Sequence, residues 1–134
     1  NASYVPSPVL SDGRLFVATD QGFAICLNAK DGNLIYKERL PGASSGARGK
    51  PFYASTVFAN RNIYAVSRRA GTFVYEAKSE FKLVAHNKAL DDSDFNGTPA
   101  FAGDALFLRS NRSLYCIASM QTASAEKNSN EGTK

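Results

Sequence analysis

Short apolar runs alternate with polar turns along residues 4–118. Runs of this length, separated by clusters of Asp, Asn and Gly, predict β-strands joined by tight turns. No long segment places its apolar residues at the spacing of three and four that an amphipathic helix requires. The pattern therefore predicts an all-β fold.

One pattern occurs three times, at residues 8–17, 57–65 and 99–108. Each copy has an apolar run, a turn of Asp, Asn or Gly, and a second apolar run, which is typical of a β-hairpin. Self-similarity at a period of about 40–50 residues favours a β-propeller of four-stranded antiparallel blades. A β-sandwich also contains many short strands but does not require such a repeat.

The repeats divide the chain into blade 1 (about 4–40), blade 2 (about 52–88) and a partial blade 3 (about 97–118). The third copy ends after three strands. Residues 119–134 have the polar composition of a disordered tail. We therefore expect a propeller fragment of about two and a half to three blades, where a complete ring needs about seven or eight.

A fragment of a ring leaves its end blades without neighbours. We expect apolar side chains to be exposed on these blades at Val9, Phe16, Phe58 and Phe107. Such a fragment is expected to associate with itself or with the remaining blades of a parent propeller.

Composition excludes several classes of function. The 134 residues carry a net charge of +4, and the cations are scattered rather than clustered, so nucleic acid is not an expected partner. No apolar run is long enough to span a membrane, and no signal peptide is visible. The single histidine, His86, and the two cysteines, Cys26 and Cys116, form no metal-ligand or nucleophile–base pattern. No catalytic residue is therefore assigned.

Loops carry function more often than strands. In a blade, the turns between the second and third strands share one face with the connections between blades, and we expect a binding surface there. Its candidate residues are Arg48, Lys50, Arg68, Arg69 and Arg112. The alternative is that these exposed charges are only solvated.

Asp92, Asp94 and Asn96 occupy alternate positions before Gly97, like the first half of a calcium-binding loop. The acidic ligand that such a loop needs at its twelfth position is missing, because residue 103 is Gly. These residues are a weak calcium candidate, and a plain turn between blades is the alternative.

Several segments resemble the PQQ-like (quinoprotein-like) β-propeller repeat proteins, whose ring shape is WD40- or YVTN-like. The likeness is greatest to the C-terminal blades of planctomycete-type bacterial members. The segments are residues 4–10, 22–32, 71–78 and 114–117. Residues 27–32 match the Leu-Asp-Ala-x-x-Gly turn of that family, and Tyr36 takes the position of the Trp that docks one blade on the next. The chain contains no Trp.

The resemblance implies two classes of function. The first is a non-enzymatic scaffold or protein-interaction module, acting in the periplasm or elsewhere outside the cytoplasm with a protein partner. The alternative is a fragment of a PQQ-dependent dehydrogenase, which holds PQQ and calcium over a Trp floor. The lack of Trp counts against the alternative, so no cofactor is expected.

Overall fold

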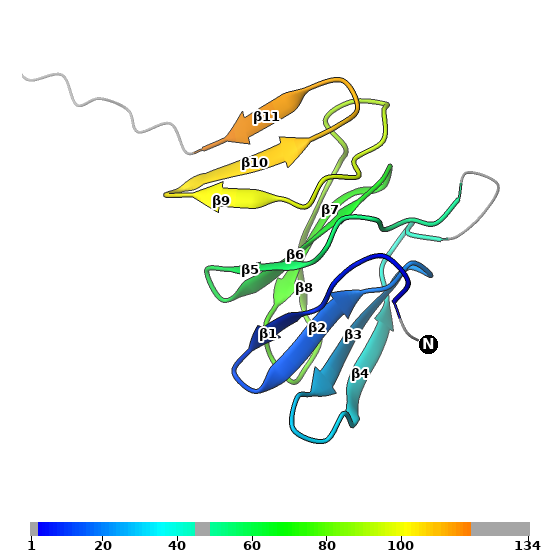
Figure 1. Ribbon diagram of the computed structural model, residues 1–134, viewed down its shortest axis with the longest axis vertical. Coiled ribbons are helices and arrows are strands. Elements are labelled where there is room, and N and C mark those ends of the chain that lie inside the picture. The colour runs from blue at the N-terminus through cyan, green and yellow to red at the C-terminus, as the bar shows by residue number, and fades with distance from the viewer. Residues whose placement is uncertain (1–2, 45–48, 119–134) are drawn as a thin grey trace, which may run out of the picture.

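The computed structural model describes residues 3–44 and 49–118, which contain eleven strands and no helix. The strands form three antiparallel sheets arranged in succession (Figure 1). Blade 1 contains β1 (Val9–Ser11), β2 (Arg14–Ala18), β3 (Phe23–Asn28) and β4 (Leu34–Arg39). Blade 2 contains β5 (Val57–Ala59), β6 (Asn62–Ser67), β7 (Gly71–Glu76) and β8 (Leu83–Asn87). Blade 3 contains β9 (Ala100–Ala102), β10 (Ala105–Arg109) and β11 (Leu114–Ile117).

This arrangement confirms the predicted propeller fragment. In each blade the strands pair in chain order, as in β1-β2-β3-β4. No helix in the described part of the chain is long and apolar enough to cross a membrane. The predicted tail, residues 119–134, lies outside the described residues.

Two-residue turns join the first two strands of blades 1 and 2. Asp12 and Gly13 have φ values of 47° and 68°, and Asn60 and Arg61 have values of 48° and 64°. Positive φ at both central residues gives a type I′ turn, whose twist matches that of the flanking strands. The sequence predicted these hairpins because Asp, Asn and Gly tolerate this conformation.

Each blade has two faces because side chains alternate along a strand. We call the face toward the next blade along the chain the downstream face, and the other the upstream face. The downstream face of blade 1 includes Phe16, Cys26 and Tyr36, and the upstream face of blade 2 includes Ile63 and Phe73. These two faces form the main core, in which all five residues are at most 8% exposed.

The expectation that Phe16 is exposed was wrong. Phe16 lies on the downstream face of blade 1, so blade 2 covers it completely. Val9 pairs with Phe16 across the hairpin and packs against the same core. Phe58 is 40% exposed, as expected, whereas Phe107 is half-buried. The repeat alone did not reveal which side of each strand faces a neighbouring blade.

The connections between blades each contribute a buried aromatic ring. Phe52 is 0% exposed and its ring lies 5.9 Å from that of Phe73 on β7. Phe95 is 3% exposed and stacks on Tyr115 of β11 at 6.1 Å. Phe95 belongs to a second core between blades 2 and 3, with Leu108. One aromatic per connection therefore anchors each blade to the next.

The turns that follow the second strands require glycine. Gly22 and Gly71 have φ values of 87° and 92°. A Cβ atom would lie 1.6 Å from the Ala43 carbonyl oxygen at Gly22, and 2.0 Å from the Asn87 carbonyl oxygen at Gly71. The backbone of each connection thus packs directly on these turns, which only glycine permits.

We predict that Phe52→Ala lowers the free energy of unfolding by about 3–5 kcal/mol, because it leaves a cavity between blades 1 and 2. Phe58→Ala in the same blade is the matched control, since Phe58 is 40% exposed. Urea denaturation followed by circular dichroism measures both. Equal losses in the two variants would show that Phe52 is no interblade anchor.

Candidate functional site

The second-to-third-strand turns and the interblade connections lie together on one side of the fragment (Figure 1). We call this surface the loop face. Its segments are residues 19–22, 68–70 and 110–113 from the turns, and 40–44, 49–56 and 88–99 from the connections.

Backbone hydrogen bonds hold these segments side by side. The Arg68 N–H donates to the Pro51 carbonyl at 2.8 Å, and the Phe95 N–H donates to the Arg68 carbonyl at 2.9 Å. The Asn111 N–H donates to the Asp94 carbonyl at 2.9 Å. Turns from successive blades are therefore joined through the connection between them.

A buried hydroxyl group begins each of the three turns. Thr19, Ser67 and Ser110 occupy equivalent positions and are 3%, 1% and 4% exposed. Each hydroxyl accepts a backbone N–H from three or four residues further along the chain, at 3.2, 3.1 and 3.0 Å. The sequence analysis assigned these residues no role, although a hydroxyl at the same position after each repeated hairpin was the available signal.

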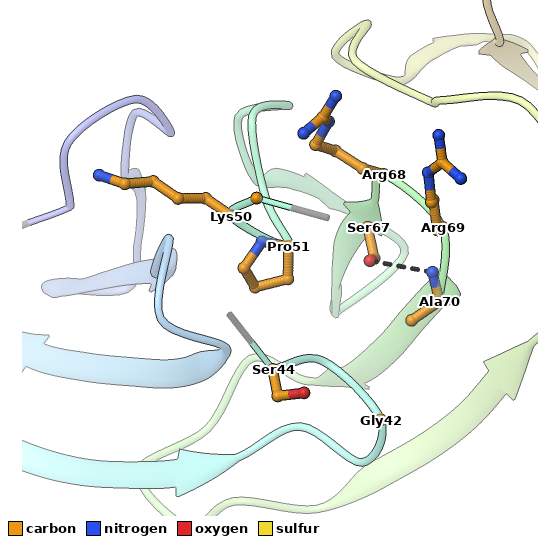
Figure 2. A pocket seen from close by; sticks show the side chains of 9 residues that line it. Gly42, Ser44, Lys50, Pro51, Ser67, Arg68, Arg69 and Ala70 are labelled. Carbon is orange, nitrogen blue, oxygen red and sulfur yellow. Dashed lines mark hydrogen bonds between the residues drawn. The ribbon is translucent and has the colours of Figure 1, made fainter. Parts of the chain in front are cut away.

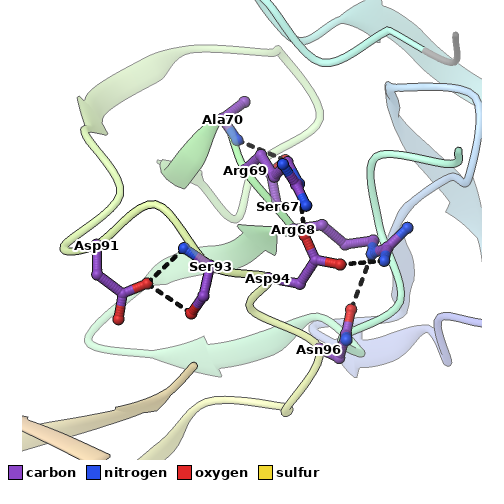
Figure 3. A network of polar contacts seen from close by, with 8 residues as sticks. All are labelled: Ser67, Arg68, Arg69, Ala70, Asp91, Ser93, Asp94 and Asn96. Atoms are coloured by element: carbon purple, nitrogen blue, oxygen red, sulfur yellow. Dashed lines mark hydrogen bonds and ion pairs between the residues drawn. The ribbon is translucent and has the colours of Figure 1, made fainter. Parts of the chain in front are cut away.

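The Asp94 carboxylate contacts two adjacent arginines, Arg68 and Arg69 (Figure 3). Its carboxylate forms ion pairs with Arg68 and with the Nε of Arg69, the latter at 2.5 Å. The Nε of Arg68 also donates to the Asn96 side-chain oxygen at 2.9 Å, and its guanidinium lies over the Tyr53 ring at 4.5 Å. Burial raises the pKa of Asp94, but the two arginines outweigh burial and lower the pKa below its ordinary value.

Asp91 links the same connection to blade 3. One carboxylate oxygen accepts the N–H and the hydroxyl of Ser93, at 2.7 and 2.6 Å. The other accepts the hydroxyl groups of Ser110 and Tyr115, at 2.6 and 2.7 Å. The bond from Ser110 and those from Ser93 hold the pKa of Asp91 well below its usual range.

Two further predicted binding residues, Lys50 and Arg112, are also paired. Lys50 Nζ lies 2.5 Å from a carboxylate oxygen of Asp20, whose side chain is 6% exposed. Arg112 pairs with Asp92, and both side chains are exposed. Arg48 lies outside the described residues. The loop face is thus built from ion pairs rather than from bare cations.

The side-chain oxygens of the calcium candidate residues accept hydrogen bonds from arginines. Asp94 and Asn96 accept from Arg68, and Asp92 accepts from Arg112. Among residues 3–44 and 49–118, no group of three or more His, Cys, Asp or Glu side chains could hold a metal ion. Each of the three candidate side chains is therefore engaged by an arginine.

A cleft of about 220 Å³ lies between the first connection and the turn after β6 (Figure 2). Arg68 and Arg69 extend from the turn to the same side, whereas Lys50 extends away from them. The remaining walls are small residues and Pro51.

Tyr36, the predicted docking residue, lies away from the loop face on β4. It is 8% exposed and its ring meets that of Phe81 of blade 2 edge-on, with centroids 5.6 Å apart. Burial raises the pKa of its hydroxyl, and that of Tyr75 as well. Neither hydroxyl has a hydrogen-bond partner among the described residues.

Comparison with known proteins supports this architecture. Residues 2–80 match the sequence family described as outer membrane protein assembly factor BamB. The crystal structure of BamB from Moraxella catarrhalis superposes on 82% of this chain with a TM-score of 0.65, at 14% sequence identity. The match covers 32% of that BamB chain, so the present chain spans about a third of its length. None of the curated proteins matches the sequence.

We predict that Asp91→Asn makes the free energy of unfolding less dependent on pH in the acidic range. Because the pKa of Asp91 is lowered by folding, its ionised form stabilises the fold above the unfolded-state pKa of about 3.9 and this contribution disappears as pH falls further. The variant lacks this contribution at pH 7 and loses less stability between neutral and strongly acidic pH. Urea midpoints across this range measure the slope. Asp104→Asn, in the exposed turn before β10, is the control, and parallel curves for wild type and Asp91→Asn would contradict the assignment.

Proposed function

The chain belongs to the family of the outer membrane protein assembly factor BamB, because more than half of it matches that family, and we propose that it is a non-enzymatic protein-interaction module. It acts as part of a β-propeller outside the cytoplasm, in the periplasm, and its loop face binds the partner. The family supports an extracytoplasmic assembly role, and the geometry of the loop face supports the site.

The observation that carries this proposal is the hydrogen bonding of the Arg69 guanidinium group. Its Nε is fixed by Asp94, while its terminal amino groups have no hydrogen-bond partner among the described residues. The side chain is 49% exposed. A guanidinium group held at one edge presents its remaining N–H donors in a fixed fork, which suits a carboxylate.

Arg112 extends the same surface onto blade 3. Its side chain is 63% exposed, and one terminal nitrogen contacts Asp92. Arg69 and Arg112 sit on turns that backbone hydrogen bonds join through residues 94 and 95. Two exposed arginines, each held by a carboxylate on joined turns, therefore fit a partner segment that carries Asp or Glu side chains.

We predict that Arg69→Gln/Arg112→Gln weakens binding of a fluorescein-labelled Glu/Gly decapeptide at least about tenfold, since a hydrogen bond to a charged group contributes about 1.5–3 kcal/mol. The matched control is Lys30→Gln/Lys78→Gln, which removes the same charge from turns outside the loop face. Fluorescence anisotropy at fixed ionic strength measures the affinity, and a Gln/Gly peptide controls for carboxylate dependence. Equal loss in both double variants would mean that net charge, and not the loop face, governs binding.

The competing proposal is a PQQ-dependent dehydrogenase fragment with calcium. It requires a Trp floor for the quinone, and this chain has no Trp. The Asp92, Asp94 and Asn96 oxygens would also have to leave their arginine partners before they could coordinate calcium.

We predict that adding the chain to PQQ and calcium chloride leaves the absorbance spectrum of PQQ unchanged. The physical reason is that the chain has no Trp side chain on which the quinone could lie. A saturable spectral shift, lost on chelation of calcium, would favour the dehydrogenase proposal instead.

A further inference from the structure

Three charged side chains meet where the turn after β6 lies between the two connections. Arg68 and Arg69 stand on the turn, and both form ion pairs with the single carboxylate of Asp94 (Figure 3). The side chains of Asp94 and Arg68 are 12% and 18% exposed, so these two charges are largely removed from water. Two cations and one carboxylate leave one positive charge without a balancing anion in this group.

The corresponding place in blade 1 is neutral. The two residues that follow the opening hydroxyl of its turn are Asp20 and Gln21. Lys50, from the connection that follows blade 1, forms an ion pair with Asp20, so one cation meets one carboxylate. A single ion pair is therefore enough to join a turn to its connection, and the second cation at Arg69 is not needed for that join.

The arginine nitrogens left outside the ion pairs border the cleft of about 220 Å³ between the first connection and this turn. Arg68 donates from Nε to Asn96 and from Nη2 to Asp94, and Arg69 donates from Nε alone. Among the described residues, nothing accepts from Arg68 Nη1 or from either terminal nitrogen of Arg69. A Cβ atom on Gly49, which lines the cleft, would lie 3.1 Å from Arg68 Nη1. This unpaired nitrogen therefore lies at the cleft wall.

The described walls of the cleft suit a small anion. Its charged lining residues are Lys50, Arg68 and Arg69, and none of the described lining residues is acidic. Lys50 is already paired and extends away from the two arginines (Figure 2). The other walls are glycines, serines, Pro51 and Ala70, which leave room beside the guanidinium groups.

We propose that this cleft is the subsite for one acidic side chain of the partner, and that Asp94 positions both arginines for it. The subsite rests on the proposed function of the loop face as a protein-binding surface. The partner's carboxylate accepts from the unpaired nitrogens of Arg68 and Arg69 and balances the remaining positive charge. A carboxylate carries the single negative charge that this requires, whereas a phosphate group carries roughly 1.5 to 2.

Asp94→Asn separates positioning from net charge. The substitution makes the loop face more positive, so net charge alone would strengthen the binding of an acidic peptide. Because an uncharged amide holds two guanidinium groups poorly, we expect binding of the fluorescein-labelled Glu/Gly decapeptide to weaken at least about fivefold instead. Asp104→Asn, the same charge change in the exposed turn before β10, is the control and should bind at least as tightly as wild type.

Arg69→Lys tests the cleft without a change of net charge, and it decides the proposal if Asp94→Asn fails to fold. Lysine keeps the positive charge but lacks the planar fork of N–H donors, so we again expect a loss of at least about fivefold. The Arg69 side chain is 49% exposed, so the fold tolerates the change, which circular dichroism checks. Arg61→Lys, in the exposed turn between β5 and β6, is the control and should bind like wild type.

Fluorescence anisotropy at fixed ionic strength gives outcomes that separate this subsite from the proposed function. A wild-type chain that binds the Glu/Gly peptide no more tightly than the Gln/Gly peptide would overturn both. Binding that is lost in Arg69→Gln/Arg112→Gln but unchanged or strengthened in Asp94→Asn or Arg69→Lys would overturn the subsite alone. Tighter binding of a phosphoserine/Gly decapeptide, with the same dependence on Asp94, would reassign the cleft to phosphate. Losses in Asp94→Asn and Arg69→Lys, with both controls unchanged, would establish the subsite.

Discussion

The peptide group between Asp94 and Phe95 touches two blades at once. Its carbonyl accepts the Asn111 N–H of blade 3, and its N–H donates to the Arg68 carbonyl of blade 2. The Phe95 ring then enters the core between these blades and stacks on Tyr115. Burying a side chain of this size stabilises the fold by about 1.5–3 kcal/mol. Because the connection fixes both turns, the ion pairs of the loop face depend on its position.

Much of the fold could be predicted from turn chemistry and the repeat. Asp12-Gly13 and Asn60-Arg61 indicated the hairpins, and the period indicated the blades. The anchoring rings of Phe52 and Phe95 were not predicted, because both residues stand before the hairpins in which the repeat is visible. An alignment extended five residues before each first strand would have shown an aromatic in every copy.

The candidate site was less predictable than the fold. Sequence position placed Arg68, Arg69 and Arg112 on one face, but their pairing with Asp94 and Asp92 joins residues 20 or more positions apart. Such pairs depend on how the connection folds back onto the turn, and no local pattern encodes that. As a result, the arginines predicted as binding residues are already partly neutralised. Only the groups left outside these pairs can bind a partner.

The hydrogen bonds from the Ser7 N–H to the Ser55 hydroxyl and from the Ser55 N–H to the Thr98 hydroxyl have a consequence for synthesis of the chain on the ribosome. The Ser7 N–H finds its acceptor only when Ser55 has emerged, and Ser55 in turn requires Thr98. Phe52 likewise needs Phe73, which is synthesised later. Since chains fold from the N-terminus as they are made, each blade remains incomplete until the next one has been translated. Folding therefore lags translation by one repeat, and the newest blade is the part of the nascent chain that chaperones would meet.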